Sequence, residues 1–75
     1  MKKKKIFDYF QLRWLINKKY GTTTEFLKKI NMSYPTFMSK IKCDVYFNQG
    51  DIEKIIRALG LELSDIPVYF FYEKS

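Results

Sequence analysis

Two helix-start signals lie close together in residues 22 to 41, TTTEFLKKINMSYPTFMSKI, and they constrain the fold more than any other feature of the chain. Thr22 and Glu25 have the spacing of a capping box, in which the hydroxyl accepts the Glu25 amide and the carboxylate reaches back. Ser33 suits the same capping role for the next helix. Asn31 lies between them and tolerates a left-handed backbone. The sequence therefore predicts two short helices joined by an abrupt turn.

Further helices are predicted from apolar residues at helical spacing. The first spans about residues 8 to 19 and ends at Gly21, which suits a left-handed cap. Another begins with Asn48 as its cap, carries an isoleucine-rich stripe and stops at Gly60. A turn or brief fifth helix is expected at residues 64 and 65. The predicted fold class is all-α, a compact five-helix domain.

The C-terminal end has a different composition. Residues 68 to 75, VYFFYEKS, follow Pro67 and are aromatic and β-prone. They are expected to form either a short C-terminal β-strand or an extended aromatic tail. Leu61 and Leu63, just before them, are expected to close the core.

The length and the cysteine content restrict the class of protein. Seventy-five residues is one domain, near the lower limit for a core without disulfides or a metal. A single cysteine, Cys43, and the absence of histidine argue against a disulfide framework and a Cys/His zinc site, and favour the cytoplasm. No long apolar run predicts a membrane span. Without a candidate general base or phosphate loop, we expect no enzyme, no cofactor and no small-molecule ligand.

The charge is unevenly distributed. The net charge is +6, and residues 2 to 5 are all lysine. Residues 18 to 42 hold six lysines against one glutamate, whereas residues 43 to 75 hold three basic and six acidic residues. A localised basic region is typical of nucleic-acid binders, because lysines near phosphates release counterions. Solvated lysines on helix surfaces are the alternative explanation.

Two short helices joined by a three-residue turn predict a helix-turn-helix, whose second helix lies in the major groove of DNA. Residues 6 to 72 resemble the Cro/CI-type (lambda-repressor-like, XRE) helix-turn-helix family, especially small Cro-like prophage repressors of Gram-positive bacteria. The resemblance is carried by the stretches FDYFQLRWLINKKYGT, TEFLKKINMS, TFMSKI, GDIEKIIRALGL and IPVYFF. It implies a repressor that binds a palindromic double-stranded DNA operator as a homodimer and occludes the promoter.

The chain departs from the family pattern at three positions. Leu27 replaces the usual alanine, which would push the two short helices apart unless Phe37 repacks. Asn31 replaces the usual turn glycine. Pro35 occupies a position where base-reading side chains are common, and it offers only van der Waals contact.

Helix geometry assigns the predicted DNA contacts. The base-contact candidates are Ser33, Tyr34, Pro35, Thr36, Met38, Ser39 and Lys42. The phosphate-contact candidates are Thr23, Lys18, Lys40, Lys2, Lys3, Lys4 and Lys5. Alternative roles remain for several of these residues: Ser33 caps its helix in any case, Tyr34 covers the preceding helix, Met38 belongs partly to the core, and the lysines at positions 2 to 5 form an inert tail. The predicted organisation is a flexible basic arm at residues 1–5, the DNA-binding domain at 6–67 and the aromatic tail at 68–75.

The aromatic residues at both ends exceed what a core of this size needs. The candidates for a dimer interface or a packed tail are Trp14, Tyr69, Phe70 and Phe71. One interpretation folds the tail back onto the first helix to complete the core. The other uses it in a two-fold dimer interface.

A second functional hypothesis keeps the fold and changes its partner. The same scaffold can serve as a protein-interaction module, such as an antitoxin or an anti-repressor, and the neutral character of Pro35 and Met38 leaves this hypothesis open. RNA binding through exposed aromatic side chains is a weaker alternative.

Overall fold

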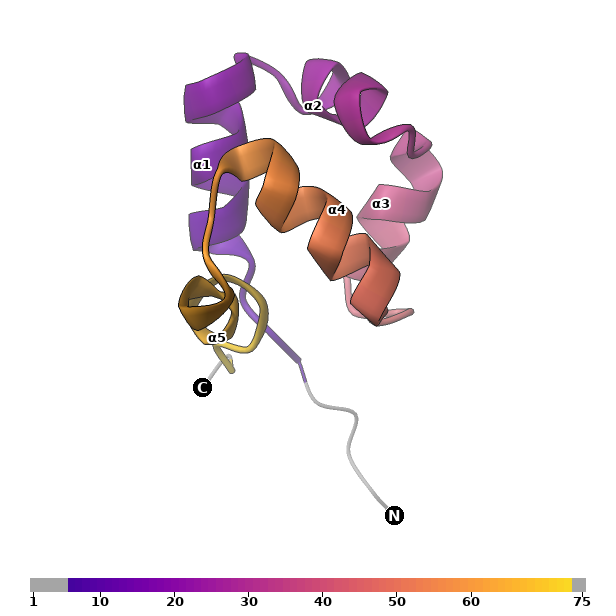
Figure 1. The fold of residues 1–75 in the computed structure, drawn as a ribbon. Coiled ribbons are helices and arrows are strands. Elements are labelled where there is room, and N and C mark those ends of the chain that lie inside the picture. The colour runs from indigo at the N-terminus through magenta and orange to yellow at the C-terminus, as the bar shows by residue number, and fades with distance from the viewer. Residues whose placement is uncertain (1–5, 74–75) are drawn as a thin grey trace.

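The computed structural model describes residues 6–73, and it confirms the predicted all-α fold. The elements are α1 (Phe10–Tyr20), α2 (Thr23–Ile30), α3 (Tyr34–Ile41), α4 (Gln49–Leu59), a 3₁₀ turn η1 (Leu63–Asp65) and α5 (Ile66–Phe70). Figure 1 shows α2 and α3 together on one side of the molecule, with α4 between them and α1, and α5 at the far end of α1. None of the helices in this range is long and apolar enough to cross a membrane.

Hydrogen bonds at the helix starts explain why the helices begin where they do. The Thr22 hydroxyl accepts the Glu25 amide at 3.2 Å, as predicted, whereas the Glu25 carboxylate lies 3.3 Å from Lys28 Nζ. At α4, Asn48 Oδ1 accepts the Asp51 amide at 2.8 Å, and Asp51 Oδ2 accepts the Asn48 amide at 3.1 Å. This reciprocal pair satisfies two amides that would otherwise lack a helical partner.

The helix ends use the predicted left-handed positions. Gly21, Asn31 and Gly60 have φ values of 84°, 57° and 70°. At Asn31 the chain turns directly into α3, and the Met32 amide donates to the Leu27 carbonyl at 3.1 Å. The turn between α2 and α3 is therefore as short as the sequence predicted.

A single core joins all five helices. Its fully buried side chains include Leu12, Ile16, Phe26, Phe37, Ile55, Leu59 and Phe70. Aromatic rings run through it in edge-to-face contact, with centroid distances of 6.3 Å for Phe26–Phe37, 6.0 Å for Phe37–Phe47 and 5.4 Å for Phe47–Phe70. Such pairs stabilise the fold beyond the area that they bury. Leu27 is also buried in this core, so the larger side chain is accommodated between the helices.

The C-terminal prediction was wrong in part. Ile66–Phe70 form a helix, with Pro67 in its first turn, where a strand or an extended tail was expected. The cause is tertiary: burial of the Phe70 ring outweighs the β propensity of the aromatic residues. Leu63, which was expected to close the core, is exposed on η1.

The two ends of the described chain meet. Phe7 and Glu73 form an isolated antiparallel bridge, and the Asp8 amide donates to the Tyr72 carbonyl at 2.8 Å. These are contacts of single residues, and residues 6–73 contain no β-sheet. The bridge holds the segment before α1 beside the end of α5.

Candidate macromolecular interface

The start of α3 is held by its own hydroxyl groups. Ser33 Oγ accepts the Thr36 amide at 3.4 Å and donates to Thr36 Oγ1 at 2.8 Å. Both side chains are nevertheless exposed, as are Tyr34 and Pro35 beside them. The predicted capping role of Ser33 is therefore present, and the entrance of α3 remains accessible to a partner.

Further along α3, the predicted base-contact residues differ in how far they are exposed to solvent. Phe37 is fully buried, so the opposite side of the helix faces outward. Met38 and Ser39 are half-buried, and Lys42 at the C-cap is exposed. Met38 packs against the core cluster, which agrees with the partly structural role considered for it. The exposed part of α3 and its caps thus combines hydroxyl, aromatic and proline groups with one lysine.

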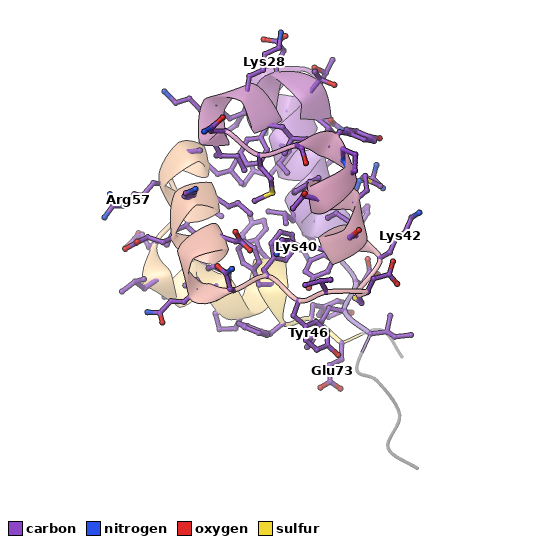
Figure 2. The ribbon with its side chains drawn as sticks, turned by 90° about the vertical axis from the view of Figure 1, so that its right-hand side faces the viewer. Lys28, Lys40, Lys42, Tyr46, Arg57 and Glu73 are labelled. Carbon is purple, nitrogen blue, oxygen red and sulfur yellow. The ribbon has the colours of Figure 1, made fainter. Side chains whose placement is uncertain are left out.

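Lys40 differs from its predicted role as a phosphate contact. Its side chain is buried, and Nζ lies 2.8 Å from Asp51 Oδ2 and 3.5 Å from the Tyr46 carbonyl oxygen. Figure 2 shows Lys40 between α3 and α4, whereas Lys42 lies at the outer side of α3. The Lys40 ammonium group therefore links the end of α3 to the start of α4 through Asp51. It faces the interior of the protein and is not available to contact a phosphate group of DNA.

This ion pair also affects Asp51. Partial burial acts to raise the pKa of Asp51, but hydrogen bonds from Lys40 and from the Asn48 amide, together with the positive charges of Lys40 and Lys54, outweigh it. The net result is a pKa below the ordinary value of the carboxyl group. Asp51 therefore stays ionised over the physiological pH range and keeps both the helix cap and the ion pair.

The other phosphate candidates in the described residues are Thr23 and Lys18, on consecutive helices. Thr23 is half-buried at the start of α2, and Lys18 is exposed on α1. The Nζ atom of Lys18 lies 4.8 Å from the centroid of the Trp14 ring, a cation–π contact. The predicted arm, Lys2 to Lys5, lies outside the described residues.

The dimer and tail candidates separate into buried and exposed rings. Phe70 is 1% exposed and belongs to the core, as the interpretation with a packed tail predicted. Tyr69 is half-buried, whereas Trp14 is 54% and Phe71 52% exposed. Of the two interpretations of the tail, the packed one holds for Phe70.

Two exposed residues that were not among the predicted site residues, Phe10 and Arg13, lie beside Trp14 on α1. Phe10 is 67% exposed and lies one helical turn before Trp14, and Arg13 is exposed beside them. The signal for Phe10 was present in the sequence, because Phe10 and Trp14 share a helix face opposite Leu12 and Ile16. Spacing alone did not show which of the two apolar faces is buried.

Tyr9 and Cys43 connect the start of α1 to the end of α3. Both are buried, and Cys43 has a left-handed backbone with φ 66°. The Phe7 amide donates to Cys43 Sγ at 3.3 Å. Burial raises the pKa of Tyr9 to about 12, with further contributions from Cys43 and Tyr46. Cys43 is a buried free thiol.

The fold and these surfaces define a small all-α protein whose accessible features suit binding to a macromolecule. The chain belongs to the family described as "Protein of unknown function (DUF739)", which matches residues 5–73. It is similar to the modulator of repression (MOR) of the temperate bacteriophage TP901-1 from Lactococcus lactis, whose solution structure is known. The two share 34% sequence identity over 87% of this chain and 88% of that chain, with a TM-score of 0.76. No curated protein matches the sequence.

These matches relate the chain to a small phage regulatory protein. They do not include the Cro/CI-type family, so membership of that family stays a prediction.

Proposed function

We propose that this protein modulates repression by binding a repressor protein, which is the anti-repressor form of the protein-interaction hypothesis. The observation that carries the proposal is its 34% identity, over 87% of its length, to a modulator of repression. Both chains are covered almost completely, so the similarity extends over the whole domain. The protein would act by binding alone, without catalysis.

The surface of α3 supports a protein partner. Within α3 and its caps the exposed residues include Tyr34, Pro35 and Thr36, and Lys42 is the one exposed cation. Affinity for DNA depends mainly on cations near phosphates. Lys40 does not contribute such a cation, because its ammonium group is paired with Asp51. This helix therefore carries little of the charge that duplex binding needs.

Exposed aromatic residues support the same conclusion. Phe10, Trp14, Tyr34 and Phe71 each expose about half of their surface or more. Aromatic side chains are enriched in the energetic centres of protein–protein interfaces, and neighbouring exposed apolar groups, such as Phe10 and Trp14 on α1, are typical of such interfaces. A domain of this size gains no stability from leaving these rings in water.

Sequence-specific DNA binding as a dimer on a palindromic operator is the second candidate. It is favoured by the accessible entrance of α3, where Ser33, Tyr34 and Thr36 are exposed after a tight turn. Lys18 and Thr23 would then contact phosphates, while Ser39 and Lys42 would read bases. The two candidates predict different partners for the same purified protein.

The test uses the protein, the repressor encoded in the same phage or prophage genome, and the operator DNA of that repressor. Isothermal titration calorimetry of protein and repressor without DNA is expected to show saturable binding. Gel-shift titration of the operator with the protein alone is expected to show no sequence preference over a scrambled duplex. Binding to the operator with strong preference, and no binding to the repressor, would replace the proposal with the second candidate. Binding to neither would overturn both.

A further inference from the structure

A shallow groove of about 680 Å³ runs along the first half of α1. Its walls are the segment before α1, the outward face of α1 and the end of α3. The lining residues used below are Ile6, Phe10, Arg13, Trp14, Ile41 and Lys42. The groove is open to solvent along its length, so it suits the surface of another macromolecule better than an enclosed small ligand.

Phe10 and Trp14 form an apolar ridge on this groove. They are one turn apart on α1, and both also line a second, smaller hollow of about 290 Å³ beside Tyr69. The core-facing residues Leu12 and Ile16 lie on the opposite side of the helix. The ridge therefore contributes little to the core, and it presents two large rings between two hollows.

The charges beside the ridge are mostly positive. Arg13 and Lys42 line the groove, and Lys18 lies over the Trp14 ring. No ion pair to these three cations is found among residues 6–73. The one carboxylate in the lining, Asp8, accepts the Phe10 amide at 2.9 Å and so caps the start of α1. An incoming group would meet apolar rings and an excess of positive charge, because Arg13, Lys18 and Lys42 outnumber this one carboxylate.

We propose that this groove binds an amphipathic helix of the partner protein that carries apolar anchors and acidic flanking residues. The inference rests on the proposed function, and it names the surface and the chemistry of the partner. Apolar side chains at i, i+3 or i+4, and i+7 of such a helix would pack on either side of the Phe10–Trp14 ridge. Glutamate or aspartate beside these anchors would face Arg13 and Lys42.

Charge complementarity favours this occupant over the alternatives. Duplex DNA presents phosphates but no apolar side chains, so it would leave Phe10 and Trp14 uncovered. A basic helix would be repelled by Arg13, Lys18 and Lys42. An acidic, apolar helix satisfies both the rings and the cations.

Trp14 provides a direct measurement, because it is the only tryptophan in the chain and lies in the groove. The probes are two synthetic helical peptides with the same leucine anchors, one flanked by glutamates and the other by lysines. The Trp14 emission of the full-length protein is followed during titration with each peptide. Burial of the half-exposed ring by the glutamate peptide is expected to shift the emission to the blue in a saturable way. The lysine peptide is expected to produce no shift.

Variants locate the effect. Arg13→Glu is expected to weaken binding of the glutamate peptide by about tenfold or more, since it replaces attraction with repulsion. Lys29→Glu makes a similar charge change on the exposed face of α2, outside the groove, and is expected to leave the affinity unchanged. Trp14→Ala, followed by calorimetry, is expected to weaken binding by about 30-fold, as for a central aromatic anchor. Circular dichroism checks that each variant folds.

Several results would overturn the inference. These are equal binding of both peptides, an equal loss for Arg13→Glu and Lys29→Glu, and an emission shift on concentrating the protein alone, which would assign the groove to a second copy. A shift caused by operator DNA would assign it to nucleic acid.

Titration with the repressor separates this inference from the proposed function. One outcome is that calorimetry shows binding of the repressor while Trp14 emission does not change and the Arg13→Glu variant binds the repressor as tightly as the natural protein. In that case the assignment of the groove fails and the proposed function stands. If the repressor does not bind while the glutamate peptide does, the proposed function fails and the chemistry of the groove stands.

Discussion

The α2–α3 unit and the outer face of α1 use their side chains in opposite ways. In the α2–α3 unit, the polar groups of Thr22 and Ser33 satisfy the backbone, and Phe26 and Phe37 are buried. On α1, Phe10 is exposed although it belongs to an apolar helix. The side chains of the α2–α3 unit cap helices or fill the core. On the outer face of α1, by contrast, the apolar surface of Phe10 and Trp14 stays exposed to solvent. The contrast suggests that the fold accounts for the residues of one region and that binding accounts for those of the other.

The largest difference in stability is expected between substitutions at two adjacent residues, the buried Phe70 and the half-exposed Phe71. Phe70→Ala removes a fully buried ring and is expected to lower the free energy of unfolding by about 3–5 kcal/mol. Phe71→Ala removes a half-exposed ring, and a cost below about 1 kcal/mol is expected. Urea denaturation followed by circular dichroism measures both. If Phe70→Ala does not fold, Phe70→Leu takes its place, and equal losses at positions 70 and 71 would contradict the division into core and surface.

The next effect concerns the link between α3 and α4. Asp51→Ala leaves the buried Lys40 ammonium without its partner and removes a helix cap, so a loss of about 3 kcal/mol is expected. Glu53→Ala, which breaks an exposed pair with Arg57, is the control and is expected to cost under about 1 kcal/mol. Both are measured by urea denaturation. A similar small loss for both variants would mean that Lys40 finds another arrangement and is available for other contacts.

A smaller effect is expected at the start of α3. Ser33→Ala removes the hydroxyl that accepts the Thr36 amide and is expected to cost about 1 kcal/mol in the free energy of unfolding. Ser64→Ala, at an exposed serine on η1, is the matched control and is expected to be nearly neutral. Thermal denaturation distinguishes them. No loss at position 33 would contradict a stabilising role for the Ser33 cap.

The smallest effect is expected from Tyr9, whose buried hydroxyl makes the stability of the protein depend on pH at the alkaline end. The pKa of Tyr9 is raised to about 12 in the folded protein from an ordinary value of 10.0, so the folded state holds its proton more tightly than the unfolded state. The stabilisation is therefore complete below pH 10 and is lost as the pH rises toward 12. Thermal melts between these pH values are expected to show a steeper decline for the natural protein than for Tyr9→Phe. Parallel declines would mean that the Tyr9 hydroxyl does not govern this loss.

The sequence predicted most accurately the features that depend on neighbouring residues. The caps at Thr22, Ser33 and Asn48 and the left-handed turn at Asn31 each need only a few adjacent residues, and all are present. These local signals placed the first four helices correctly, within about two residues at the start of α1.

The errors concern contacts between distant parts of the chain. Lys40 points inward because α4 brings Asp51 to it, and no spacing within α3 shows this. The aromatic tail is helical because Phe70 enters the core, which local β propensity could not reveal. The candidate site was predicted only in part for the same reason: the direction of α3 followed from Phe37, but the exposure of Phe10 depended on which side of α1 the other helices cover.

The bridge between Phe7 and Glu73 has a consequence for the connectivity of the chain. Because Phe7 pairs with Glu73, a short linker can join these two positions, and new ends can be opened in the loop at residues 42–48, between α3 and α4. Such a circular permutant keeps α2 and α3 consecutive while α5 comes to precede α1. The order of the helices along the chain is thus one solution among several that the same packing permits.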